Sequence, residues 1–309
     1  MLGGFRRPAQ NDQGASAEGA MIAAKSAAAN LPDLLVEAKR VAATVSAGWH
    51  GRRRAGPGET FWQFRPFDFG EPARRIDWRR SARDDTLLVR EREWEAAHTV
   101  LLWVDRTASM RVRSRMADVS KEQRAVVLLL ALAELLGRGG ERIGLADGPP
   151  PSARRDAADR IAEALAETET EGAAARPKLI NVKRHADVVL IGDFLDPLGE
   201  WAETFRTLAA RGTRTHLVQV LDPAEEQFPF GGRTRFVDPE SGLAFLVGKA
   251  EAWRTSYQDT LAAHKAALAT EARRLGSSLI VHHTDHSLAP ALLALRSALA
   301  GERDGNAGA

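Results

Sequence analysis

Short apolar runs alternate, through most of the chain, with longer segments in which apolar residues recur every three to four positions. The runs are typical of buried parallel strands, and the longer segments are typical of helices with one buried face. Strands are predicted over residues 100–104, 142–146, 188–191, 215–221 and 278–282. Helices are predicted from the capping box that Ser120 opens to the glycines at 137–140, and over residues 157–166, 198–210, 250–275 and 289–299. This alternation predicts an α/β fold, with a mostly parallel sheet covered by helices on both faces.

The region before residue 99 has a different pattern. Apolar residues recur at helical spacing from Leu31 to Gly48, which predicts an N-terminal helix. Residues 1–30 contain nine alanines and four glycines and almost no large apolar side chains, so we expect a loose tail there, and another at residues 302–309. Glycines and prolines break any long helix between residues 48 and 98, where short extended pieces predict a small β-rich module.

These patterns predict a division of the chain into four parts. A disordered tail occupies residues 1–30, and the N-terminal helix and the β-rich module together occupy residues 31–98. The α/β domain occupies residues 99–301, with a hairpin at residues 236–247, and a short tail follows.

Composition narrows the possible functions. The 309 residues include no cysteine, which excludes disulfides, thiolate zinc sites, iron–sulfur clusters and cysteine nucleophiles. The net charge of +2 does not by itself favour nucleic acid or an anionic membrane as a partner. No apolar run approaches the ~18 residues of a membrane-spanning helix, and polar residues follow Arg6 and Arg7 where a signal peptide needs its apolar region. We therefore expect a cytoplasmic protein.

Two of the predicted strands end in aspartate. The first is followed by Asp105, Thr107 and Ser109 at alternate positions, and the second is followed by Asp193. Ligands in open α/β sheets collect beyond the carboxyl ends of the strands. A carboxylate and two hydroxyls can converge there on a hard cation such as Mg²⁺ and leave room for waters. Asp105, Thr107, Ser109 and Asp193 are therefore the predicted metal ligands, in an arrangement suited to binding more than to hydrolysis.

Residues 105–109 resemble the Asp-x-Ser-x-Ser element of the metal-ion-dependent adhesion site in von Willebrand factor A domains. A longer string upstream is similar to the signature of the bacterial "domain of unknown function 58" family: Gly58-Glu59-Thr60-Phe61, Arg65-Pro66-Phe67, Arg75-Ile76-Asp77-Trp78, Ser81-Ala82-Arg83 and Val89-Arg90-Glu91. The resemblance covers roughly residues 31–300. It implies an A-type, Rossmann-like domain that acts in complex assembly with a MoxR-type AAA+ ATPase and membrane-anchored A-domain proteins.

The match to the adhesion-site pattern is incomplete. Thr107 stands where the family usually has serine, although it keeps the hydroxyl. The pattern also needs a threonine from a second loop, and neither Thr168 nor Thr170, each flanked by glutamates, can be assigned that role.

Other interpretations of the same residues stay open. Asp105 and Asp193 could instead be turn or cap residues, or they could serve a divalent-metal hydrolase. A haloacid-dehalogenase-type phosphatase needs a second aspartate where Thr107 stands, so that class is excluded. His282, His283 and His286 suggest a metal cluster, but adjacent residues on a strand point to opposite faces, so polar residues at a strand end are the simpler interpretation.

Residues 52–92 hold eleven arginines and seven acidic residues, a local net charge of +4. Basic residues with aromatics are typical of nucleic-acid surfaces, but arginines among carboxylates more often form paired networks. We expect internal pairing of Arg75, Asp77, Arg83 and Glu91, with Trp78 buried, on a module that is a structural platform or a docking surface for a protein.

The sequence contains no Gly-x-Ser-x-Gly elbow, phosphate-binding loop or dinucleotide-binding glycine string. The expected function is therefore non-enzymatic: divalent-metal-assisted binding of protein partners. The hydrolase is the alternative, and nucleic-acid binding through the arginines is a weaker one.

Overall fold

The computed structural model describes residues 30–50, 61–68, 72–83, 86–92, 98–168 and 174–300. The expected tails at residues 1–30 and 302–309 lie outside the described residues, apart from Asn30. The chain divides into two compact units, one formed by Trp49–His98 and the other by Met1–Gly48 with Thr99–Ala309.

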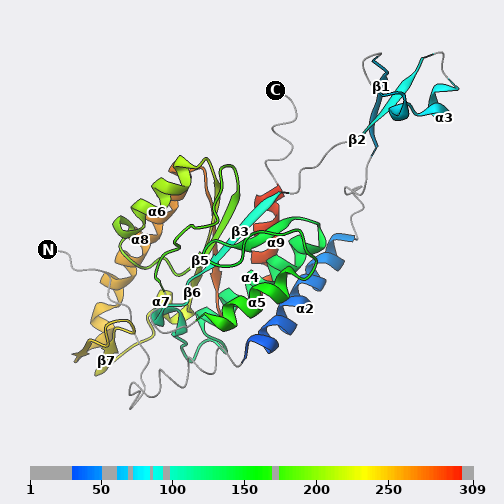
Figure 1. Ribbon diagram of the computed structural model, residues 1–309. Helices are drawn as coiled ribbons and strands as arrows, with labels where there is room; N and C mark the ends of the chain where they lie inside the picture. The colour runs from blue at the N-terminus through cyan, green and yellow to red at the C-terminus, as the bar shows by residue number, and fades with distance from the viewer. Residues whose placement is uncertain are drawn as a thin grey trace. The chain divides into compact units, whose positions relative to one another are not determined.

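The larger unit is an α/β domain, with a parallel sheet that carries helices on both faces, which confirms the predicted fold class (Figure 1). In the part of the chain that the structure describes, five strands form this sheet in the order β4-β3-β5-β6-β9, and every neighbouring pair is parallel. Their bounds are β3 (Thr99–Val104), β4 (Arg142–Leu145), β5 (Asp187–Gly192), β6 (Arg214–Leu221) and β9 (Ser278–His283).

Two layers of helices cover the sheet. One face packs against α2 (Leu31–His50), α4 (Lys121–Arg138), α5 (Ala157–Glu167) and α9 (Leu288–Ala300), whose buried residues share one core with Val100, Val189 and Val218 of the sheet. The other face packs against α6 (Leu198–Ala210) and α8 (Arg254–Arg274), where Trp201 and Phe205 lie among the apolar residues beneath the strands. The N-terminal helix α2 thus belongs to the larger unit, whereas the sequence grouped it with the β-rich module.

Several short elements connect these layers. The predicted hairpin forms from β7 (Thr234–Val237) and β8 (Ala244–Val247), which pair antiparallel. The remaining short elements of the larger unit are η2 (Ala108–Arg111), α7 (Pro223–Gln227) and η3 (Ala250–Trp253). Helix α7 was not predicted from the sequence. No described helix combines the length and the apolar composition that a membrane span requires.

The strand order creates a switch point next to β3. The chain passes from β3 to β4 on one side and then crosses to β5 on the other side of β3. In sheets of this kind, a crevice opens at the carboxyl ends of the two strands on either side of the switch. Those strands are β3 and β5, which are the strands that end in Asp105 and Asp193.

The smaller unit contains β1 (Phe61–Pro66) paired antiparallel with β2 (Leu88–Arg92), together with η1 (Ala73–Arg75) and α3 (Trp78–Ser81). Ile76 and Val89 are buried between these elements. The expectation that Trp78 is buried is wrong, because 62% of this side chain is exposed. Trp78 is the first residue of α3, and a single helical turn has too little surface to cover an indole ring. The predicted internal pairing of Arg75, Asp77, Arg83 and Glu91 stays a prediction, because the side chains of Arg75 and Glu91 lie outside the described residues.

Candidate functional site

Two of the four predicted ligands, Asp105 and Asp193, follow adjacent strands at the switch point, and Thr107 and Ser109 lie in the loop that Asp105 begins. Strands β3 and β5 are in register from Val100 opposite Asp187 to Val104 opposite Ile191, so both end at the same edge. The amide of Asp105 donates to the Ile191 carbonyl at 2.8 Å, which extends the pairing by one residue. A Cβ atom at Gly192 would lie 3.1 Å from the Cβ of Asp105, so the missing side chain at Gly192 leaves the space that Asp105 occupies.

The Asp105 loop is held by its own polar groups. Asp105 Oδ1 accepts a hydrogen bond of 2.9 Å from the amide of Thr107, an Asx-type turn. Thr107 Oγ1 and Ser109 Oγ lie 3.0 Å apart and are hydrogen-bonded to each other. All three side chains are buried. Asp105 therefore acts as a turn residue, which was one of the alternative roles considered for it.

Asp193 is buried just beyond β5 and orders the next loop. Its Oδ1 accepts from the Leu195 amide at 3.2 Å, and its main-chain oxygen accepts from Gln219 Nε2 at 2.9 Å. Between these contacts Phe194 has a φ of 49°, a left-handed conformation that is uncommon for a bulky residue. The second carboxylate oxygen, Oδ2, accepts from Lys121 Nζ at 2.9 Å.

Lys121 connects Asp193 to a third carboxylate. Its Nζ also lies 2.5 Å from Glu225 Oε1, and its side chain is completely buried. Glu225 Oε2 accepts from the amide of Asp222 at 2.8 Å as part of the capping box that begins α7 directly after β6. Burial is the main factor raising the pKa of Glu225; the negative charge of Asp193 raises it further, and Lys121 opposes the rise.

A second ion pair lies beside the first. Arg106, in the Asp105 loop, donates through Nε to Glu122 Oε1 at 3.1 Å and through a terminal nitrogen to the Leu165 carbonyl at 2.6 Å. Arg106 and Glu122 are both buried. The first two residues of α4, Lys121 and Glu122, thus each contribute to an ion pair at the crevice.

The arrangement of the predicted metal ligands does not suit a divalent ion at Asp193. Asp193 Oδ2 already binds the Lys121 ammonium, which lies where a metal ligated by this oxygen would be. Thr168 donates its hydroxyl to Ala164 O of its own helix, and Thr170 lies outside the described residues. Among the described residues, no group of three or more His, Cys, Asp and Glu side chains is arranged to hold a metal ion.

Sequence reasoning missed Lys121 and Glu225, although both carried a signal. Lys121 follows the recognised N-cap Ser120, and a lysine in the first turn of a helix opposes the positive end of the helix dipole. Asp222, Pro223 and Glu225 form a capping box with proline at the first helical position, a helix start that can be recognised from sequence.

Of the histidines at the end of β9, His283 and His286 pack ring against ring, with centroids 5.4 Å apart. The His282 side chain is buried and that of His283 is half-buried, and His283 Nε2 lies 2.8 Å from Glu226 Oε2.

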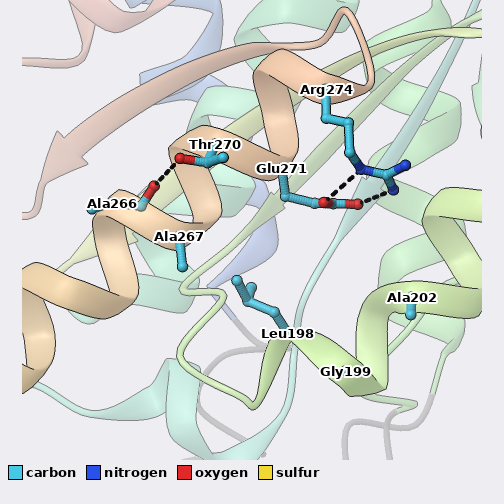
Figure 2. A pocket seen from close by; sticks show the side chains of 8 residues that line it. All are labelled: Leu198, Gly199, Ala202, Ala266, Ala267, Thr270, Glu271 and Arg274. Carbon is cyan, nitrogen blue, oxygen red and sulfur yellow. Dashed lines mark hydrogen bonds and ion pairs between the residues drawn. The ribbon is translucent and has the colours of Figure 1, made fainter.

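A shallow groove of about 640 Å³ lies between α6 and α8 (Figure 2). Most of its lining consists of Leu198 and small residues, with the Glu271–Arg274 ion pair at one end. Its one hydroxyl, that of Thr270, is donated to the Ala266 carbonyl. Its two charged side chains, Glu271 and Arg274, are paired with each other.

Comparison with known proteins identifies relatives of the chain. The family model described as "Protein of unknown function DUF58" matches residues 63–267. Uncharacterized proteins of Mycobacterium tuberculosis (Rv1480) and Mycobacterium bovis (Mb1516) are each 29% identical over 273 residues, which is 84% of this chain and 85% of theirs.

Two solved structures are also similar. BatB, a conserved hypothetical protein of Bacteroides thetaiotaomicron, matches 67% of this chain and 99% of its own with 14% identity and a TM-score of 0.41. An aerotolerance-related membrane protein of Bacteroides fragilis matches 66% of this chain and 99% of its own with 14% identity and a TM-score of 0.40.

Proposed function

Because the chain belongs to the DUF58 family of proteins of unknown function, as its sequence signature predicts, we propose that it is a non-enzymatic interaction protein whose Arg/Trp module (residues 49–98) binds protein partners. The larger unit supplies the folded body, and the module supplies the contact surface.

The observation that carries this proposal is the exposure of Trp78. Its side chain is 62% exposed, and the neighbouring Arg79 and Arg80 are also exposed, as are Arg74 and Arg83. Tryptophan and arginine contribute most of the binding energy at many protein interfaces. The arginines favour a partner with an acidic surface.

Trp78 is also held in place before any partner binds. Asp77 caps α3 by accepting from the Arg80 amide at 3.0 Å. Ser81 Oγ donates to the Asp77 carbonyl and accepts from the Leu88 amide, both at 2.8 Å, which attaches the turn to β2. These bonds fix the backbone turn that carries Trp78, and a preorganised turn loses less conformational entropy on binding.

The carboxyl-end crevice supports a non-catalytic role. Its acidic and basic groups are buried and bonded to one another, whereas a general acid, base or nucleophile must reach a substrate. The divalent-metal-assisted binding that the sequence predicts is not part of the proposal, because the donors do not fit the ion.

The proposed partner is the MoxR-type AAA+ ATPase that the family resemblance implies, in the cytoplasm and together with membrane-anchored A-domain proteins. Binding of the purified ATPase of the same organism to the full chain tests the proposal, with magnesium and ATP present throughout. Trp78→Ser is expected to weaken binding at least about tenfold, as loss of an interface hot spot does.

Trp253→Ser is the matched control, because Trp253 is also exposed (49%) but lies in the larger unit. It is expected to bind within about twofold of wild type, the effect of a surface residue outside the interface. Equal binding by wild type and Trp78→Ser would contradict the proposed surface, and no binding by wild type would contradict the proposed partner.

A further inference from the structure

Lys121 occupies a position that is unfavourable for a lysine. It is the first residue of α4, where the helix dipole repels a cation, and its side chain is completely buried. Removing an ammonium from water costs several kcal/mol unless carboxylates compensate for the lost hydration. A lysine here therefore depends on the negative charges around it.

The compensating charges come from the ends of two adjacent strands. Asp193 follows β5 and lies 2.9 Å from Nζ, and Glu225 lies in the helix that follows β6 and is 2.5 Å from Nζ. The Lys121 ammonium thus connects the start of α4 to two segments that follow it along the chain, one 72 residues later at Asp193 and one 104 residues later at Glu225. It lies where carboxylates gather at the switch point, with Asp105 at the adjacent strand end.

We infer that the Lys121 ammonium is a built-in cation, which takes the place of a divalent metal ion among Asp105, Thr107, Ser109 and Asp193 and closes this site to metals. The inference does not depend on the proposed binding surface, which lies in the smaller unit.

Electrostatics and geometry both support this assignment. A divalent ion a few ångströms from a buried ammonium would be strongly repelled, because the interior screens charge far less than water does. Mg²⁺ also needs oxygen ligands at about 2.0–2.1 Å in octahedral geometry. Asp193 Oδ2 already binds Nζ at 2.9 Å. Metal binding would therefore require Lys121 to leave.

The inference makes opposite predictions for wild type and for a variant without the ammonium. Wild type is expected to take up no Mn²⁺ in calorimetric titration, and its melting temperature is expected to be the same in EDTA and in millimolar Mn²⁺. Lys121→Ala removes the cation that two buried carboxylates share, so its melting temperature in EDTA should fall by on the order of 10 °C. Mn²⁺ should bind this variant and restore part of the loss.

Two further variants serve as controls. Lys183→Ala removes an exposed lysine and should behave as wild type in both solutions. The triple variant K121M/D193N/E225Q neutralises the three charged groups with side chains of similar size, so it is expected to fold and to bind no Mn²⁺, even if Lys121→Ala does not fold.

The results that would overturn the inference are equally specific. One is stoichiometric Mn²⁺ uptake by wild type that is lost in Asp193→Asn. The other is a folded Lys121→Ala protein that gains no affinity for Mn²⁺, which would show that the ammonium does not occupy a metal-binding position.

Discussion

His282 illustrates how the fold changes the chemistry of a single residue. Its side chain lies on β9 with 4% of its surface exposed, and its Nε2 has no hydrogen-bond partner among the described residues. The pKa of His282 is lowered to about 4, mainly by burial and also by the charges of Arg124, His283 and His286, with Asp285 opposing the shift. The folded protein therefore keeps this imidazole neutral.

This shift predicts a pH-dependent contribution to stability. The pKa of His282 is lower in the folded than in the unfolded state, so between pH 6.5 and 4 the unfolded chain binds the extra proton. The contribution is fully present above pH 6.5 and is lost as the pH falls towards 4. The free energy of unfolding of wild type minus that of His282→Gln should therefore fall by up to about 3 kcal/mol over this range.

Urea denaturation at a series of pH values measures this difference, with His185→Gln as the control, because His185 is exposed and is not among the groups that shift the pKa of His282. A difference that stays constant between pH 6.5 and 4 would show that His282 is not held neutral by burial.

Other single residues show where sequence information ends. The identity of Asp105 and Asp193 as strand-end carboxylates was predictable, because each follows an apolar run. The exposure of Trp78 was not predictable, because an indole among arginines is equally compatible with a stacked core and with a binding surface.

Among the elements, β4 shows how the sheet protects an edge. Residues 149–152 fold back along it, and Ile143 and Ser152 exchange two hydrogen bonds of 3.0 and 3.1 Å. Gly144 makes this approach possible, since a Cβ there would lie 2.6 Å from Pro151 N and 2.7 Å from Pro149 O. Covering an edge strand in this way prevents it from pairing with other chains.

Gly144→Ala is therefore expected to destabilise the protein by roughly 1–3 kcal/mol, because the added methyl contacts backbone that can yield only by moving. Gly199→Ala is the matched control, since nothing lies within 4 Å of the Cβ it adds in α6, and it should change stability by less than about 1 kcal/mol. Urea denaturation of both variants checks this, and equal stabilities would mean that the 149–152 segment is free to retreat.

Element prediction succeeded where local signals and tertiary structure agree. The central strands β3, β5 and β6 were predicted because they are buried on both faces and read as continuous apolar runs, and α4 because Ser120 and Gln123 form a capping box. Helix α7 was missed because its five residues are too few for a hydrophobic period, although its capping box was visible.

At the scale of the whole molecule, strand order positions the site. A sheet in the order β4-β3-β5-β6-β9 brings Asp105 and Asp193 to one edge, as their shared position at strand ends predicts. Sequence could not reveal that Lys121 and Glu225 meet there, because 104 residues separate them and their contact depends on how α4 and α7 pack. The sequence therefore predicted where charge collects, but not which cation balances it.

The central claim is that a lysine, and not a metal, balances this charge, so that the crevice is a closed part of the fold. A crystal structure of the full chain grown in Mn²⁺, with anomalous scattering recorded at the manganese edge, tests the claim most directly. We predict no manganese peak within coordination distance of Asp105 or Asp193, and density for Lys121 Nζ between Asp193 and Glu225. A manganese ion bound by Asp105, Thr107, Ser109 or Asp193, with Lys121 turned away, would contradict it.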